Sequence, residues 1–195
     1  MRLIKDLSIG FVIPIIFLTL LNNVSNGASN APIVGSQLPE TTLPIPDNPD
    51  EMRYLGLTGK GSSFQIPQIK AKVVVIEIFS MYCPHCQREA PEVNKLYSAI
   101  ENDQDLKGKI KLIGIGVGNS PFEVEVFKKK YDVPFPLFPD EDFSIHKCFG
   151  ETRTPYFIAI KINDDGAHKV IYSQLGGMKG VEQFLKKMTQ LSGLE

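Results

Sequence analysis

Residues 73–86 join an apolar run to two cysteines and read Val73-Val74-Val75-Ile76-Glu77-Ile78-Phe79-Ser80-Met81-Tyr82-Cys83-Pro84-His85-Cys86. The first seven residues are mostly β-branched and apolar, which predicts a strand that is buried on both faces, as in a parallel sheet. Pro84 suits the first position of a helix, because its missing N–H costs no hydrogen bond there. We therefore expect a strand over residues 73–79, a short turn, and a helix that begins at Pro84, with Cys83 near its N-cap.

The two cysteines stand three residues apart, so Cys86 falls about one helical turn beyond Cys83. This spacing brings the sulfurs within bridging distance, and the pair can alternate between dithiol and disulfide. The N–H groups and the dipole at the start of the helix favour a thiolate at Cys83, and a protonated His85 would add positive charge beside it. We predict that Cys83 is the nucleophile and that the deeper Cys86 resolves the mixed disulfide. The redox-active disulfide then takes the place of a bound cofactor, and no metal is expected.

Glu77 interrupts the apolar strand, six residues before Cys83. Burial of an unpaired carboxylate is costly, so the pKa of Glu77 should rise. Below the cysteine pair, Glu77 could take and return the proton of Cys86, directly or through water. The alternative is that Glu77 points to solvent or forms a structural salt bridge.

Thr154-Pro155 introduces a later apolar run, residues 156–162. A cis Pro155 would face the cysteines and leave the backbone of Thr154 free to pair with a substrate strand. An ordinary trans proline at the start of a strand is the alternative. Together with Tyr82, which stands directly before the first cysteine, these two residues are expected to shape a substrate groove.

The rest of the chain predicts an α/β fold. Strands are expected over residues 110–117, 156–162 and 168–175, helices over residues 84–100, 121–131, 142–149 and 181–191, and a loop or short strand over residues 132–139. Residues 28–50 are rich in proline and indicate an extended lead-in rather than a helix. The order of the elements indicates a central mixed β-sheet flanked by helices, parallel first and antiparallel at the end.

The composition is that of an ordinary globular protein, with 195 residues of which 43% are hydrophobic and 22% charged. The 21 basic and 22 acidic side chains give a formal net charge of −1, which lacks the basic footprint of a nucleic-acid binder. Three cysteines are too few for a small fold held together by disulfides. We therefore expect one domain that binds no nucleic acid, and we also expect it to act as a monomer.

The N-terminus has the pattern of a secretory signal peptide. Two basic residues precede an uncharged apolar stretch, residues 7–21, and small and polar residues follow it. At 15 residues, this stretch is shorter than the ~20 residues that span a bilayer. Cleavage after Gly27 would remove residues 1–27 and leave residues 28–195, and an uncleaved membrane anchor is the alternative. Both outcomes predict a periplasmic or otherwise extracytoplasmic domain, where disulfides persist.

Together these features resemble the thioredoxin superfamily. The carboxylate Glu77, the Cys-x-x-Cys pair, the helix proline Pro91 and the pre-strand proline Pro155 appear in that superfamily's order, and the resemblance covers roughly residues 35–192. Residues 35–39 and the insert that precedes Pro155 are similar to the exported TlpA/ResA-like branch, also called redoxin-type. The resemblance implies a thioredoxin-like fold with an N-terminal extension and an inserted strand–helix element.

Two departures from this branch concern the direction of electron flow. The tryptophan that usually precedes the first cysteine is Tyr82 here. The dipeptide Pro84-His85 and residues 77–80 are similar instead to the DsbA-type periplasmic disulfide oxidases, whose long all-helical insertion finds no room in this chain. The scaffold therefore implies a reductase and the dipeptide a more oxidising pair, and the direction stays open.

These observations predict an exported thiol–disulfide oxidoreductase that exchanges disulfides with protein substrates. The resemblance implies service in cytochrome c maturation or in periplasmic thiol reduction, with a membrane protein as the redox partner. A peroxiredoxin-like peroxidase with antioxidant activity is one alternative, because residues 127–136 are similar to that group, although its peroxidatic cysteine usually lacks a partner three residues on. A non-catalytic module that binds a metal or senses redox state is the other.

Cys148 is left outside the redox pair. The expected role is that of a small buried side chain in the core, and a third redox thiol or an intermolecular partner is the alternative. A metal site made of Cys83, Cys86, His146 and Cys148 is disfavoured, because two ligands separated by one residue on a helix do not converge.

Overall fold

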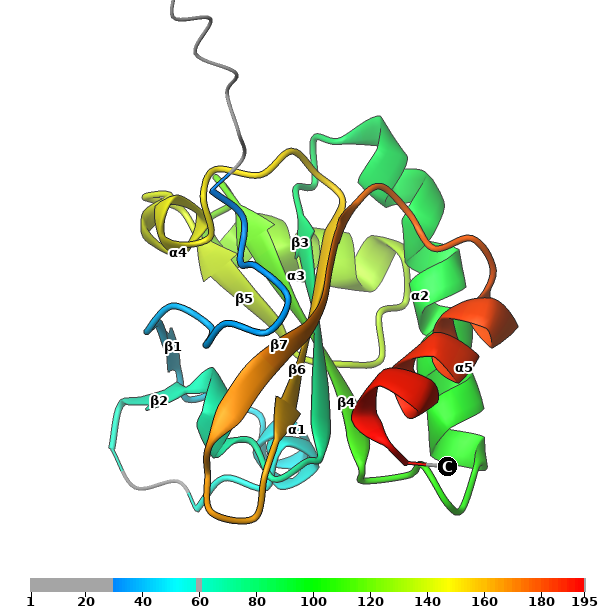
Figure 1. The fold of residues 1–195 in the computed structure, drawn as a ribbon. Helices are drawn as coiled ribbons and strands as arrows, with labels where there is room; N and C mark the ends of the chain where they lie inside the picture. The colour runs from blue at the N-terminus through cyan, green and yellow to red at the C-terminus, as the bar shows by residue number, and fades with distance from the viewer. Residues whose placement is uncertain (1–29, 59–60, 195) are drawn as a thin grey trace, which may run out of the picture.

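The computed structural model describes residues 30–58 and 61–194. Its central sheet has five strands, in the order β5-β4-β3-β6-β7. They are β3 (Val73–Phe79), β4 (Ile110–Val117), β5 (Leu137–Asp140), β6 (Tyr156–Ile162) and β7 (His168–Leu175). β3, β4 and β5 run parallel, whereas β6 and β7 are each antiparallel to the strand before them in the sheet, so the predicted mixed sheet is confirmed (Figure 1).

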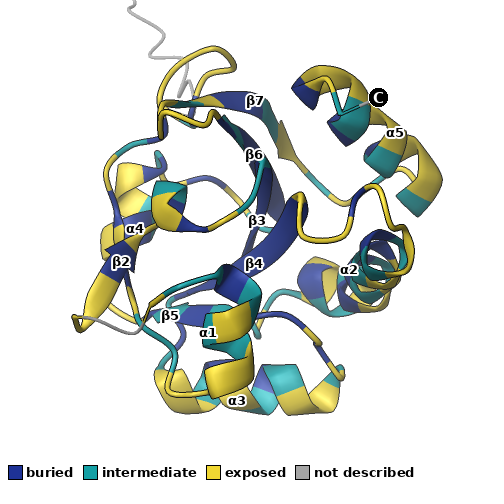
Figure 2. Ribbon diagram, turned by 90° about the horizontal axis from the view of Figure 1, so that it is seen from below, coloured by how far each residue is buried: buried dark blue, intermediate teal, exposed yellow. Residues whose placement is uncertain are grey.

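Helices and a small second sheet cover the two faces of the central sheet. α2 (Pro84–Asn102), α3 (Pro121–Lys130) and α5 (Val181–Ser192) share one apolar core with the first face. The other face carries α1 (Pro49–Leu55), the single turn η1 (Ile66–Gln68), α4 (Ser144–Cys148), and the antiparallel strands β1 (Thr42–Pro44) and β2 (Ser63–Gln65). Figure 2 shows the buried central strands and, around them, helices that each expose one side.

The strands β3, β4, β6 and β7 begin and end at the residues predicted from their apolar runs. β3 and β4 are buried along their whole length, as the unbroken apolar runs required. α2 and α5 also begin where predicted, and they extend one or two residues further. The bounds of the long strands and helices can therefore be predicted from the local sequence pattern.

At the end of the proline-rich lead-in stands α1, a helix that was not predicted. The side chain of Asn48 accepts the N–H of Asp50 at 2.8 Å, Pro49 takes the first position, and Gly56 ends the helix at φ 70°. Its last residue is fully buried. Because so short a helix depends on its caps and on tertiary packing rather than on propensity, its residues carry little signal of their own.

The first described residues run along the outer edge of the sheet. The N–H of Gly35 donates to the carbonyl oxygen of Val170, and the N–H of Val170 donates to that of Ser36, both at 2.8 Å. Asn30 lies against Gly150, where a Cβ atom would fall 2.2 Å from the backbone carbon of Asn30. The N-terminal segment thus contacts both β7 and the loop that leads into β6.

The predicted signal peptide, residues 1–27, lies outside the described residues. Within residues 30–58 and 61–194, no helix is long and apolar enough to cross a membrane. Export through residues 7–21 therefore stays a prediction.

Candidate active site

The cysteine pair lies where β3 passes into α2. Cys83 is the N-cap residue of α2, with an extended backbone at φ −83° and ψ 113°, and Pro84 stands in the first turn. The sulfur of Cys83 accepts the N–H of Cys86 at 3.3 Å, and the N–H of Cys83 donates to the carbonyl oxygen of Ser80 at 3.0 Å. The start of the helix therefore holds the first sulfur over an N–H group that has no partner within the helix.

The two thiols differ in exposure and in acidity. Cys83 is partly exposed, whereas Cys86 is fully buried. Partial burial pushes the pKa of Cys83 up, but side-chain hydrogen bonds with Cys86 and Thr154 oppose it. The backbone N–H groups of Cys86 and His85 add to these bonds, so the pKa of Cys83 lies below its ordinary value. Burial raises the pKa of Cys86 well above its usual range. Cys83 thus suits a thiolate nucleophile, and Cys86 stays protonated until a base acts on it.

The loop before β6 borders the cysteine pair from the other side. The Thr154–Pro155 peptide bond is cis, and the thiol of Cys83 donates to the carbonyl oxygen of Thr154 at 3.4 Å. The carbonyl oxygen of Pro155 accepts the N–H of Gly176 at 2.9 Å, which ties this loop to the end of β7. The structure therefore brings Thr154 and Pro155 to the side of Cys83 where a substrate groove was expected.

Glu77 is buried beneath α2. The side chain is 4% exposed and lies on the same face of β3 as Val75 and Phe79, in contact with the core around Cys86. Among the described residues, its Oε1 atom has no hydrogen-bond partner. Burial, followed by the charges of Glu89 and Cys83, raises the pKa of Glu77 to about 8. Glu77 therefore does not face solvent, and near neutral pH it can exchange a proton with a neighbouring thiol.

Glu89, on α2, belongs to this site although the sequence pattern did not single it out. Its carboxylate accepts the backbone N–H of Met178 at 2.7 Å, and a Cβ atom on Gly177 would fall 2.1 Å from Oε2 of Glu89. Burial raises the pKa of Glu89, and the charge of Glu89 in turn raises the pKa of Glu77. No local signal marks Glu89, because it meets the loop after β7 only in the folded chain.

Glu89→Gln is expected to lower the pKa of Glu77, because the amide keeps an acceptor for the N–H of Met178 but carries no charge. Closure of the disulfide needs the proton of Cys86 to leave, so its pH profile should move down by roughly half a pH unit or more. Single-turnover closure rates between pH 5.5 and 9 measure this shift. Glu125→Gln, on the exposed side of α3, is the matched control. An unshifted profile in Glu89→Gln would remove Glu89 from the site.

The side chain of His85, the residue between the two cysteines' helix positions, contacts Arg88. Nη2 of Arg88 lies 2.9 Å from Nδ1 of His85. The backbone N–H of His85 helps to lower the pKa of Cys83, and a charge on its imidazole stays a prediction.

The turn before the cysteine pair is held by the end of the neighbouring strand. Asn119, which is fully buried, accepts the N–H of Met81 at 2.8 Å and donates to the hydroxyl of Ser80 at 3.4 Å. Tyr82 is 65% exposed, and its hydroxyl donates to the carboxylate of Glu123. Asn119 was not predicted as a site residue. Its position two residues after β4, the parallel neighbour of β3, is the signal that could have found it.

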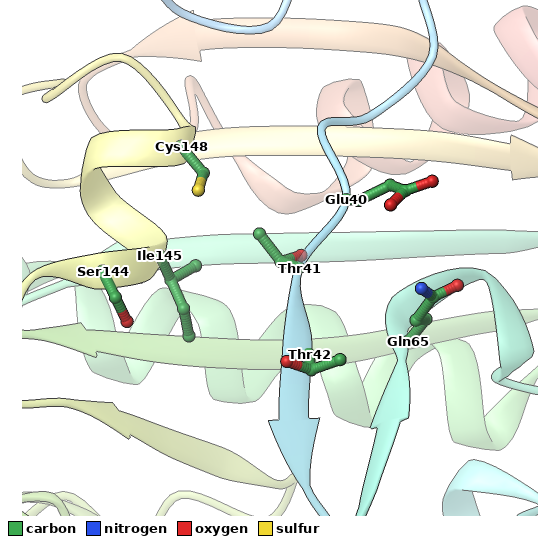
Figure 3. A pocket seen from close by; sticks show the side chains of 7 residues that line it. All are labelled: Glu40, Thr41, Thr42, Gln65, Ser144, Ile145 and Cys148. Atoms are coloured by element: carbon green, nitrogen blue, oxygen red, sulfur yellow. The ribbon is translucent and has the colours of Figure 1, made fainter.

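Cys148 is exposed, so the prediction that it packs as a small buried side chain is wrong. In the short helix α4, Ile145 and the following Phe149 face the core, which leaves Cys148 at a pocket of about 330 Å³. Figure 3 shows its sulfur directed toward Thr41; the other lining residues are Glu40, Thr42, Gln65, Ser144 and Ile145.

Metal-binding side chains do not gather in the part of the chain that the structure describes. There, no three His, Cys, Asp or Glu side chains come close enough together to hold a metal ion. His146 binds elsewhere, since its Nε2 lies 2.7 Å from the carbonyl oxygen of Thr152.

Comparisons with known proteins agree with the fold. Residues 34–170 match the AhpC/TSA family. The thiol-disulfide oxidoreductase ResA of Halalkalibacterium halodurans is 26% identical over 129 residues, which cover 65% of this chain and 68% of that protein. ResA of Bacillus thuringiensis subsp. konkukian is 29% identical over 132 residues, 67% of this chain and 71% of that protein.

Solved structures support the same fold. The thioredoxin domain of a thiol-disulfide oxidoreductase from Bacteroides vulgatus superposes with a TM-score of 0.57 at 16% identity, covering 80% of this chain and 97% of that domain. The predicted thioredoxin-like fold is thereby confirmed.

Proposed function

The chain belongs to the AhpC/TSA family, and from this premise we propose that it is a thiol–disulfide oxidoreductase that acts on protein thiols through Cys83 and Cys86. The observation that carries the proposal is the contrast between the two sulfurs. The pKa of the partly exposed Cys83 is lowered and that of the buried Cys86 is raised. An accessible thiolate and a protected thiol one turn apart suit an exchange of disulfides in two steps.

In the reducing direction, the thiolate of Cys83 attacks one sulfur of a substrate disulfide. The substrate S–S bond breaks, a mixed disulfide forms at Cys83, and the first substrate sulfur leaves as a thiolate that takes a proton from water. Cys86 then gives its proton to the ionised form of Glu77 and attacks the sulfur of Cys83. The Cys83–Cys86 disulfide forms, and the second substrate sulfur leaves as a thiolate and takes the proton that Glu77 received. The substrate gains two electrons and two protons, one proton from water and one from Cys86 by way of Glu77, and the reverse sequence oxidises a dithiol.

Peroxide reduction is the weaker alternative. A thiolate at Cys83 could attack hydrogen peroxide, but the buried thiol of Cys86 one turn along favours closure of a disulfide after exchange. Consumption of hydrogen peroxide that depends on Cys83, at a rate above that of insulin reduction, would replace the proposal by this alternative.

The proposal extends to compartment and partners. The signal pattern of residues 1–27 supports export, with residues 28–195 as the working domain outside the cytoplasm, released or held by residues 7–21. A reductase in that compartment needs a source of electrons, for which a membrane redox protein is the proposed partner. Thiols of apocytochrome c and of misfolded exported proteins are the proposed substrates, and the domain is proposed to act as a monomer.

Cys86→Ala is expected to stop the reaction at the mixed disulfide, because no second sulfur remains to release Cys83. Expressed in its native compartment, this variant should accumulate covalent adducts that a reducing agent dissolves. Non-reducing electrophoresis followed by mass spectrometry identifies the captured proteins. Cys83→Ala/Cys86→Ala is the control and should capture nothing. Adducts at the same level in this control would contradict the assignment of Cys83 as the nucleophile.

The reduction potential of the Cys83–Cys86 pair determines the direction of electron flow. Equilibration of the Cys83–Cys86 pair with glutathione gives the reduction potential. A value near about −270 mV would match a reductant of the thioredoxin type, and a value near about −120 mV an oxidant of the DsbA type.

A further inference from the structure

Cys148 ends α4 as an exposed thiol and lines a pocket of about 330 Å³, which lies on the face of the sheet opposite α2. We propose that this pocket is a modification site, where Cys148 holds a short peptide thiol with a free amino terminus as a mixed disulfide. The inference goes beyond the proposed function and does not depend on it, because neither Cys83 nor Cys86 takes part.

Three segments that are distant in the sequence meet around the pocket. α4 supplies one wall, and β2 supplies Gln65 on the other side. The proline-rich lead-in and β1 cross between them and supply Glu40, Thr41 and Thr42. Figure 3 shows Cys148 on one side of the lead-in, Glu40 on the other, and Thr41 between them. A ligand that is bonded to Cys148 and reaches Glu40 therefore passes over Thr41. A chain of two or three residues has this form, and it suits a volume at the lower end of the range for ligand pockets.

Thr41 carries a buried hydroxyl with an unused hydrogen-bonding capacity. The residue is 9% exposed, and among residues 30–58 and 61–194 its Oγ1 atom has no hydrogen-bond partner. Burial of a polar atom without a hydrogen bond is unfavourable, so folded proteins retain few such atoms. Figure 3 shows the side chain of Thr41 extending from the lead-in toward Cys148. A ligand that brings hydrogen-bond donors into the pocket would satisfy this oxygen.

The charge of the pocket selects an ammonium group on the ligand. Among the described residues that line it, Glu40 alone is charged. No ion pair within residues 30–58 and 61–194 includes Glu40. An ammonium group has three N–H donors and no acceptor, which matches a carboxylate together with the oxygens of Thr41 and Gln65. A thiol that carries only negative charge would instead meet the carboxylate with like sign. A peptide thiol supplies the ammonium group at its amino terminus and further donors along its backbone.

The modification is an exchange of disulfides. Cys148 loses its proton to water, and its thiolate attacks one sulfur of a symmetric peptide disulfide, whose S–S bond breaks. One half of the peptide disulfide stays on Cys148 as a mixed disulfide. The other half leaves as a thiolate and takes a proton from water. The sulfur of Cys148 is oxidised and the departing sulfur is reduced, so the small disulfide is the oxidant and no other is required.

The test uses the disulfides of two tripeptide amides, Gly-Gly-Cys with a free amino terminus and the same tripeptide acetylated, which differ in the ammonium charge. The protein is equilibrated with each disulfide and its thiol at one fixed ratio, and free thiols are then blocked at acidic pH. Trypsin cuts after Lys147 and Arg153, so residues 148–153 form a peptide in which Cys148 is the one cysteine. Mass spectrometry of this peptide gives the fraction of Cys148 that carries each tripeptide, and hence the exchange constant.

We expect the exchange constant of Cys148 to be about fourfold higher for the free-amine tripeptide than for the acetylated one, as for one ion pair near a surface. A synthetic peptide of residues 145–153 has the same thiol without the pocket and should distinguish the two by less than about 1.5-fold. In Glu40→Gln, the preference should fall to the same level. Glu151→Gln removes an exposed acid that stands three residues after Cys148 and does not line the pocket, so this matched control should keep the preference.

Thr41→Val separates contact with the ligand from a structural role. Loss of the hydroxyl should lower the exchange constant of the free-amine tripeptide by about threefold, because one hydrogen bond to the ligand is removed. It should also raise the urea midpoint of the unmodified thiol form, in which the hydroxyl is unpaired. A higher midpoint with an unchanged exchange constant would mean that Thr41 does not contact the ligand, and it would overturn the site.

Three further results would overturn the proposal. They are equal exchange constants for the two tripeptides, a preference that Glu40→Gln keeps, and dimers linked through Cys148 in place of tripeptide adducts. None of them bears on the proposed function, because insulin reduction through Cys83 is measured separately on the same protein.

Discussion

Cys83→Ser is expected to have no thiol–disulfide exchange activity in either direction. A serine hydroxyl does not ionise near neutral pH and does not attack a disulfide, and Cys86 is fully buried and cannot reach a protein substrate in its place. The rates of insulin reduction and of oxidative refolding of a reduced protein should both fall to those without enzyme. These two assays together cover both directions of electron flow.

The control for this experiment is the third cysteine. Cys148→Ser removes an exposed thiol at the end of α4, outside the cysteine pair, and should leave both rates within about twofold of the unmodified protein. Activity of Cys83→Ser in either assay would contradict the proposed mechanism. A large loss in Cys148→Ser would instead show that the third thiol takes part in the exchange.

Glu77→Gln is expected to stabilise the protein at neutral pH. In the folded chain the pKa of Glu77 is about 8, against 4.5 for the exposed group. Between these values the unfolded chain has lost the proton that the folded chain still binds, so the free energy of unfolding falls as the pH rises. This loss in the free energy of unfolding reaches about 3 kcal/mol at pH 7 and stops growing above pH 8. The amide of Gln resembles the protonated acid and never ionises, so Glu77→Gln avoids this loss of stability.

Urea denaturation of the reduced protein from pH 4 to 9 tests this linkage. The unmodified protein and Glu77→Gln should have similar free energies of unfolding at pH 4 and should diverge steadily up to pH 8. Glu125→Gln alters an exposed ion pair with Lys129 and should follow the unmodified protein throughout. Parallel curves for the unmodified protein and Glu77→Gln would mean that Glu77 has an ordinary pKa.

The same variant should slow closure of the Cys83–Cys86 disulfide. Without a carboxylate to accept its proton, Cys86 must ionise in a buried site where its pKa is raised. General-base catalysis is typically worth 10²- to 10⁴-fold, and a loss of about 10²-fold is expected. A variant that is more stable and less active would identify Glu77 as a residue retained for chemistry at the expense of stability.

The features predicted from sequence are those with a local pattern. The apolar runs located β3 and β4, and the Cys-x-x-Cys spacing with Pro84 located the start of α2 and both thiols. A carboxylate within an apolar strand predicted the burial of Glu77. Each of these signals is contained in a few consecutive residues, which is why it survives without knowledge of the fold.

The rest of the site depends on contacts between distant segments. Glu89 is one charged residue among several on α2, and only its meeting with Met178 makes it part of the site. The contact between Arg88 and His85 depends on side-chain positions that no spacing rule predicts. The prediction that Cys148 is buried was wrong because its exposure depends on which residues of α4 face the core.

The pairing of residues 35 and 36 with β7 has a consequence for how copies of this protein meet one another. An uncovered outer strand presents a row of N–H and C=O groups that can recruit strands from other molecules. Gly35 and Ser36 occupy part of that row through their bonds to Val170. The N-terminal segment thus covers part of this edge strand and hinders its pairing with strands of other molecules. A chain shortened past residue 36 would expose the edge and aggregate more readily, although its cysteine pair would remain complete.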